Sequence, residues 1–206
     1  MNIFSLKSVN TAIKILLALL LTINTAAALW SPLLSIFVIN NIVGATFVTI
    51  GVTGAIYSVV KSLLQIPIAK YLDARAGEKD DFIVIFTGIF LAGMASFAFI
   101  FIGKAWELAL VQVLWGIADA CTMAAYYAIF SHHIDKKSAA FEWSLFSVGG
   151  MIVAIAVGGL IGSLLIQSFG FTLVFVLAGI MNLLALALLG FFYPYIKVMR
   201  KKEVQP

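Results

Sequence analysis

The 206-residue sequence is poor in charge and in cysteine. Only 11% of its residues are charged, against about 25% in a typical soluble domain, whereas 63% are hydrophobic. With a mean hydropathy of +1.12, this composition excludes a soluble globular protein and predicts a chain whose outer surface faces lipid. The single cysteine, Cys121, can form no disulfide within the chain, so cysteine usage does not indicate the compartment.

Residue patterns of enzymatic chemistry are also missing. The sequence has no Ser/His/Asp constellation, no metal-ligand spacing and no phosphate-binding loop. An enzyme is therefore not predicted, and neither a cofactor nor a metal is expected. The net charge of +4 does not indicate nucleic-acid binding, because the basic residues stand at the ends of apolar runs, where they set the orientation of a membrane protein.

Six apolar runs are long enough to span a bilayer, which takes about 20 residues in a helix. Short charged or turn-forming segments separate them, so neighbouring helices are expected to be antiparallel. The predicted fold class is an all-α membrane protein with six transmembrane helices, in a single domain over residues 1–206. The predicted spans are roughly 12–38, 46–70, 82–103, 106–131, 142–167 and 171–196.

The basic residues predict how these helices are oriented. With the N-terminus in the cytoplasm, the outer loops hold only Lys104, and nearly all other lysines and arginines fall on the cytoplasmic side. This bias predicts a multi-pass protein of the inner membrane with both termini cytoplasmic. One alternative concerns the start, because Lys7, Lys14 and the apolar run after them also resemble a cleavable signal peptide. That run continues through Ile39, which favours a spanning helix.

The loop between the second and third predicted spans carries a resemblance to a known family. Residues 68–79 contain Asp73, Arg75 and Gly77, and they resemble the signature loop between helices two and three of the major facilitator superfamily. Ala69 stands where that signature has a glycine, and one additional residue separates Asp73 from Gly77. The resemblance implies that Asp73, Arg75 and Gly77 belong to a cytoplasmic gate.

Spans four and five carry looser similarities to the same family. The stretch that begins at Gln112 is similar to the family's helix-four pattern, in which many proton-linked members have arginine at this position. Gly149, Gly158 and Gly162 match the glycine spacing typical of the drug–proton exchangers, although Ser163 replaces the proline of that signature. The resemblance covers nearly the whole chain and indicates the superfamily rather than a subfamily.

The fifth predicted span also has a stripe of small residues. Gly150, Ala154, Gly158 and Gly162 recur every four positions, which gives one helix face that another backbone can approach closely. We expect this stripe to pack against a neighbouring helix rather than to contact a substrate.

Two ionisable residues, Lys61 and Asp119, are predicted at the same depth in the membrane. Lys61 precedes Asp73 by twelve positions, as Asp119 precedes Ser131, which places each about 18 Å from the cytoplasmic end of its helix. Charged residues inside the bilayer are costly and usually mark a transport pathway or an ion pair. The two are therefore expected either to take part in transport or to form a structural pair, and both interpretations allow them to touch.

Polar and aromatic side chains recur at helical spacing on the first, second and fourth predicted spans, and each set forms a stripe along one face of its helix. Three such stripes would be unfavourable against lipid, so they are expected to face one water-filled cavity. The resemblance agrees, because helices one, two, four and five line such a cavity in the family. The candidate substrate and coupling residues are Asn24, Tyr57, Lys61, Gln65, Gln112, Trp115, Asp119 and Tyr126.

Members of the family have twelve helices in two halves, whereas this chain has six. The prediction is a secondary transporter of a small solute that works in the lipid bilayer by alternating access, as a parallel homodimer. Proton coupling through Asp119 is left open. One alternative is the N-terminal half of a longer transporter or a non-transporting membrane subunit, and a second is a drug–proton exchanger. The residues name neither the substrate nor the direction of transport.

Overall fold

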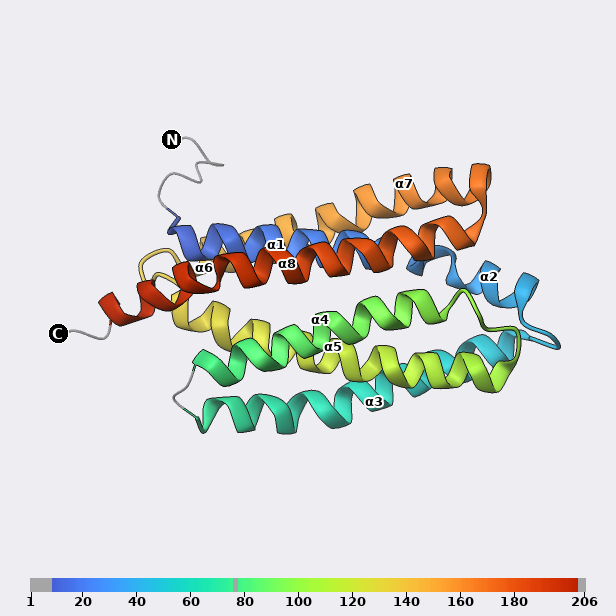
Figure 1. Cartoon of the computed structure of the whole chain (residues 1–206), viewed down its shortest axis with the longest axis horizontal. Helices are drawn as coiled ribbons and strands as arrows, with labels where there is room; N and C mark the ends of the chain where they lie inside the picture. The colour runs from blue at the N-terminus through green and yellow to red at the C-terminus, as the bar shows by residue number, and fades with distance from the viewer. Residues whose placement is uncertain (1–8, 76–77, 204–206) are drawn as a thin grey trace.

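The computed structural model describes residues 9–75 and 78–203 and is almost entirely helical. Within these residues, six helical spans are long and apolar enough to cross a membrane, which confirms the predicted fold class. The start of α1 and the end of α8 lie at the same end of the bundle, which is called below the end of the chain termini (Figure 1). The first span consists of α1 (Thr11–Ala28), a short 3-10 turn (Ser31–Leu33) and α2 (Leu34–Asn41); the others are α3 (Phe47–Asp73), α4 (Glu78–Ala98), α5 (Ala105–His133), the run of α6 (Ala139–Leu145), a π-helical segment (Phe146–Ile152) and α7 (Val153–Phe169), and finally α8 (Phe171–Glu203).

The helices form two groups of three. Helices α1, α7 and α8 make one group and α3, α4 and α5 the other, and contacts between α4 and α8 join them (Figure 1). The first three spans and the last three therefore exchange partners, since α1 packs on α7 and α8 while α5 packs on α3 and α4. This exchange is the arrangement expected of two nested inverted repeats of three helices.

Close approach between helices depends on small residues. A Cβ atom on Gly162 would lie 1.9 Å from the carbonyl oxygen of Leu29, and one on Gly158 would lie 2.7 Å from the Cβ of Ala28. Gly150 and Ala154 of the same stripe are buried as well. The stripe therefore faces α1 and acts in packing, as expected.

The first and fifth spans are each interrupted by an irregular turn. The first breaks after α1, where Pro32 supplies no backbone N–H and the chain restarts as α2. In the fifth, the π-helical turn contains Gly149 and Gly150, and Asn24 of α1 donates from its Nδ2 to the carbonyl oxygen of Gly150 at 2.9 Å. Such a turn is tolerated inside a membrane because neighbouring side chains satisfy the backbone groups that it displaces.

Helices α3 and α7 lie at the outer edges of the two groups (Figure 1). Only Thr53 and Leu72 of α3 are buried, although this helix spans 27 residues. In α7 the buried residues are those of the small stripe alone. Both edge helices thus present long apolar faces to whatever surrounds the bundle.

The packing of α7 on α1 generates a stability prediction. Gly162→Ala should lower the free energy of unfolding by at least the roughly 1–3 kcal/mol of an overpacked core, because its new methyl group would overlap the backbone of Leu29. Thermal unfolding in detergent measures the effect. Gly190→Ala is the matched control, since nothing lies within 4 Å of its Cβ position. Equal melting temperatures for both variants would contradict the packing role.

Candidate functional site

An ion pair links α3 to α5 near the middle of the membrane. The Nζ of Lys61 lies 2.6 Å from Oδ2 of Asp119, and the hydroxyl of Tyr57 donates to the same oxygen at 2.5 Å. Lys61 Nζ is also 3.5 Å from the Tyr57 hydroxyl oxygen. One carboxylate oxygen thus accepts from two donors on consecutive turns of α3, so Asp119 is held in one position.

The sequence around Asp119 allows this short distance. Gly116, one turn earlier on α5, faces the backbone of α3, and a Cβ atom there would lie 2.9 Å from the carbonyl oxygen of Tyr57. Without a side chain at Gly116 the two helices can approach closely enough for Lys61 and Tyr57 to reach Asp119. The side chains of Lys61 and Asp119 keep 30% and 24% of their surface exposed, so the pair is only partly desolvated.

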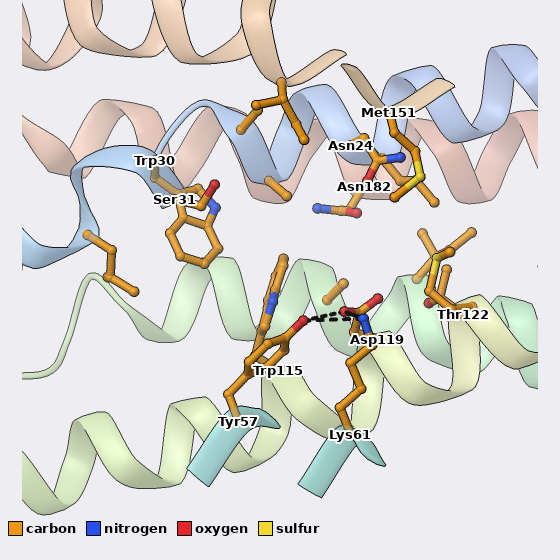
Figure 2. A pocket seen from close by; sticks show the side chains of 18 of the residues that line it. Asn24, Trp30, Ser31, Tyr57, Lys61, Trp115, Asp119, Thr122, Met151 and Asn182 are labelled. Carbon is orange, nitrogen blue, oxygen red and sulfur yellow. Dashed lines mark hydrogen bonds and ion pairs between the residues drawn. The ribbon is translucent and has the colours of Figure 1, made fainter. Parts of the chain in front are cut away.

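The ion pair borders a cavity of about 450 Å³ between the two helix groups (Figure 2). Six of the eight predicted substrate and coupling residues line it: Asn24, Tyr57, Lys61, Gln112, Trp115 and Asp119. The third and sixth spans contribute Ile89, Ala92 and Asn182, so the cavity is lined by more helices than the family resemblance implied. Further lining residues include Trp30, Ser31, Thr122, Met123, Tyr127, Met151 and Ile155.

Two predicted residues do not line the cavity. Tyr126 is fully buried in the core of the bundle, where its ring stacks on Phe130 at 5.8 Å and packs against Phe146 at 5.6 Å. Its hydroxyl has no hydrogen-bond partner among the described residues. Gln65 lies one turn beyond Lys61 on α3, outside the cavity lining. The polar stripes on α3 and α5 therefore extend beyond the cavity.

Two amide side chains lie across the cavity from the ion pair (Figure 2). Asn24 donates from Nδ2 to Gly150 O, and Asn182 donates from Nδ2 to Ala178 O at 2.8 Å. Each amide nitrogen is thereby engaged, and each carbonyl oxygen remains as an acceptor. Sequence reasoning missed Asn182, although a buried asparagine in the most apolar of the six spans was a detectable signal.

Aromatic rings line the part of the cavity next to the break in the first span. Trp30, at the break in the first span, contacts Trp115 edge-on at 5.0 Å between ring centroids and Phe99 at 4.8 Å. Trp30 is only 2% exposed, and its indole N–H makes no hydrogen bond with any described residue. Trp30 was not among the substrate and coupling residues predicted from the sequence.

Two of the three predicted gate residues, Asp73 and Arg75, lie at the end of the bundle where α1 begins and α8 ends. Asp73 and Arg75 are both exposed, and Arg75 forms an ion pair with Asp80 at 3.4 Å while its guanidinium lies over the ring of Tyr71 at 4.5 Å. Gly77 lies outside the described residues.

The described part of the chain also contains no group of three His, Cys, Asp or Glu side chains that could hold a metal ion.

Comparison with known proteins places this fold and cavity in a family. The sequence model of the Major Facilitator Superfamily matches residues 15–206, and the chain belongs to this superfamily. Members are transporters rather than enzymes. The chain is also similar to the multidrug resistance protein MdtG of Dickeya zeae, with 24% identity over 189 residues. That alignment covers 89% of this chain but only 43% of the relative.

A double-variant experiment tests whether Lys61 and Asp119 stabilise each other or are only close in space. Lys61→Met and Asp119→Asn should each lower the melting temperature, because each leaves a partner inside the membrane without its counter-charge. The loss should stay below the roughly 3–5 kcal/mol of fully buried pairs, since both side chains are partly exposed. The double variant should recover most of it. Additive losses would show that the two residues are energetically independent.

Proposed function

We propose that this chain is one six-helix unit of a secondary transporter that moves a small solute by alternating access. The observation that carries this proposal is the cavity of about 450 Å³ at mid-depth that borders the Lys61–Asp119 pair. Ionisable groups at that depth are costly and mark substrate or ion pathways. Membership of a transporter superfamily supports the same conclusion.

A second six-helix unit would complete the cavity, and we propose a second copy of the chain in parallel orientation. A twofold axis along the membrane normal would bring the edge helix α3 of one copy opposite α7 of the other. Both helices have long exposed apolar faces, and such faces can pack against a second chain as well as against lipid. The alternatives are the second half of a longer transporter and a membrane subunit that does not itself transport.

The cavity lining favours a solute with an apolar body and several hydrogen-bonding groups. Trp30 and Trp115 provide aromatic surface. The carbonyl oxygens of Asn24 and Asn182 are acceptors on the opposite wall. The multidrug relative supports drug–proton exchange as a second candidate, whereas Ser163, in place of the signature proline, does not.

We further propose that Asp119 carries protons during transport. A carboxylate at mid-depth must be paired, hydrated or protonated. Lys61 and Tyr57 supply partners in the present conformation, and the cavity can supply water. A conformation in which Lys61 and Tyr57 no longer reach the Asp119 carboxylate would favour its protonation, which couples proton binding to the conformational equilibrium.

The parallel dimer predicts specific crosslinks. Val59 on α3 and Val157 on α7 are both exposed, and each lies about 18 Å from the end of its span opposite the chain termini. After Cys121 is replaced by alanine, mixed chains carrying Val59→Cys or Val157→Cys should form inter-chain crosslinks in liposomes. Leu184→Cys, exposed on α8, should not crosslink to Val59→Cys. A strictly monomeric particle that still transports would rule out the homodimer.

The proton role predicts a selective loss of function. Asp119→Asn keeps the shape of the side chain but cannot exchange a proton. The variant should retain solute counterflow across liposomes and lose at least about tenfold in accumulation driven by a pH gradient. Lys61→Met tests whether loss of the pair alone has this effect. Full gradient-driven accumulation by folded Asp119→Asn would contradict proton coupling at this residue.

A further inference from the structure

A surface groove between α1 and α8 is separate from the central cavity. It has a volume of about 190 Å³, and none of its lining residues lines the central cavity. Helices α1 and α8 lie side by side along it (Figure 1). The groove is lined by Thr11, Lys14, Ile15, Ala18 and Leu19 of α1 and by Leu188, Leu189 and Phe192 of α8.

The groove begins at the membrane surface and runs inward. On α1 it extends from the first helical residue, Thr11, to Leu19, a distance of about 12 Å along the helix axis. On α8 it ends at Phe192, close to Pro194, where the apolar span also ends. The groove therefore lies in the leaflet on the side of the chain termini. It extends from the headgroup region into the adjoining hydrocarbon.

Polarity changes along the groove in one direction. Its two polar residues, Thr11 and Lys14, lie in the first turn of α1 and contribute mainly the apolar parts of their side chains to the wall. The ammonium of Lys14 therefore lies outside the apolar wall, at the end of the groove where α1 begins, and all of the other lining residues are apolar. Ala18 is exposed, and its small side chain leaves the hollow between the larger neighbours. Lys14 is exposed too and forms no ion pair with any described residue. The positive end of the α1 dipole adds to the charge of Lys14 at the membrane surface.

We propose that this groove binds one anionic phospholipid. Its acyl chain would lie along the apolar part and its phosphate would meet the ammonium of Lys14. A phospholipid has the same order of polarity as the groove, with a charged head at the surface and hydrocarbon inside. Charge complementarity favours an anionic lipid, because a zwitterionic headgroup carries its own cation beside the phosphate. A lysine near the surface of an anionic leaflet contributes about 1 kcal/mol of attraction to its headgroups.

Native mass spectrometry of the full chain in detergent tests the headgroup contact. Phosphatidylglycerol and phosphatidylcholine with identical acyl chains are the probes. The wild-type chain should retain phosphatidylglycerol about fivefold better, the ratio expected of about 1 kcal/mol from one lysine at the surface. Lys14→Gln should remove the preference and Lys14→Arg should keep it. Lys70→Gln is the control, because Lys70 is an exposed lysine in the last turn of α3 on the same membrane side.

The acyl-chain contact is tested separately. Ala18→Phe fills the groove without changing charge and should reduce retention of both lipids by several fold. Ala187→Phe, at an exposed position of α8 outside the groove, should leave retention unchanged. Equal retention of the two lipids by the wild-type chain, or equal effects of Lys14→Gln and Lys70→Gln, would overturn the proposal. Unchanged retention by Ala18→Phe would overturn it as well. None of these outcomes depends on whether the chain transports.

Discussion

The cost of placing charge in hydrocarbon is the constraint on which the rest of this structure depends. Lys61 and Asp119 meet each other at 2.6 Å and Tyr57 donates to the same carboxylate oxygen, which offsets part of the cost of placing two ionisable side chains at this depth. The close approach of α3 and α5 at Gly116 makes that meeting possible. The cavity of about 450 Å³ beside the pair is polar on this side and large enough to hold water.

Packing in the two helix groups leaves the cavity between them. Small residues hold α7 against α1 and α5 against α3, so each group is tight internally. The edge helices α3 and α7 gain little burial from the chain itself. Their long exposed faces are the largest apolar surfaces of the two groups that the described residues leave uncovered.

Hydropathy was sufficient to predict the six spans, because a bilayer imposes length and apolarity on every crossing helix. Helix length also placed Lys61 and Asp119 at one depth, and they proved to be in contact. Periodicity could not say where a polar stripe leaves the cavity, so Gln65 and Tyr126 were assigned to it although neither lines it. Asn182 and Trp30 were missed because one stands alone in an apolar run and the other reaches the cavity through a helix break.

Alternating access, as proposed above, requires the cavity beside Asp119 to open to each side of the membrane in turn, and thiol labelling of a cavity residue measures this. Ala27 lines the cavity, whereas Ala187 is exposed on α8 outside it. With Cys121 replaced by alanine, Ala27→Cys in sealed vesicles should react with a membrane-impermeant thiol reagent applied from either face. Ala187→Cys should react poorly, because a thiol in hydrocarbon does not ionise. Labelling of Ala27→Cys from one face only, or from neither, would contradict alternating access.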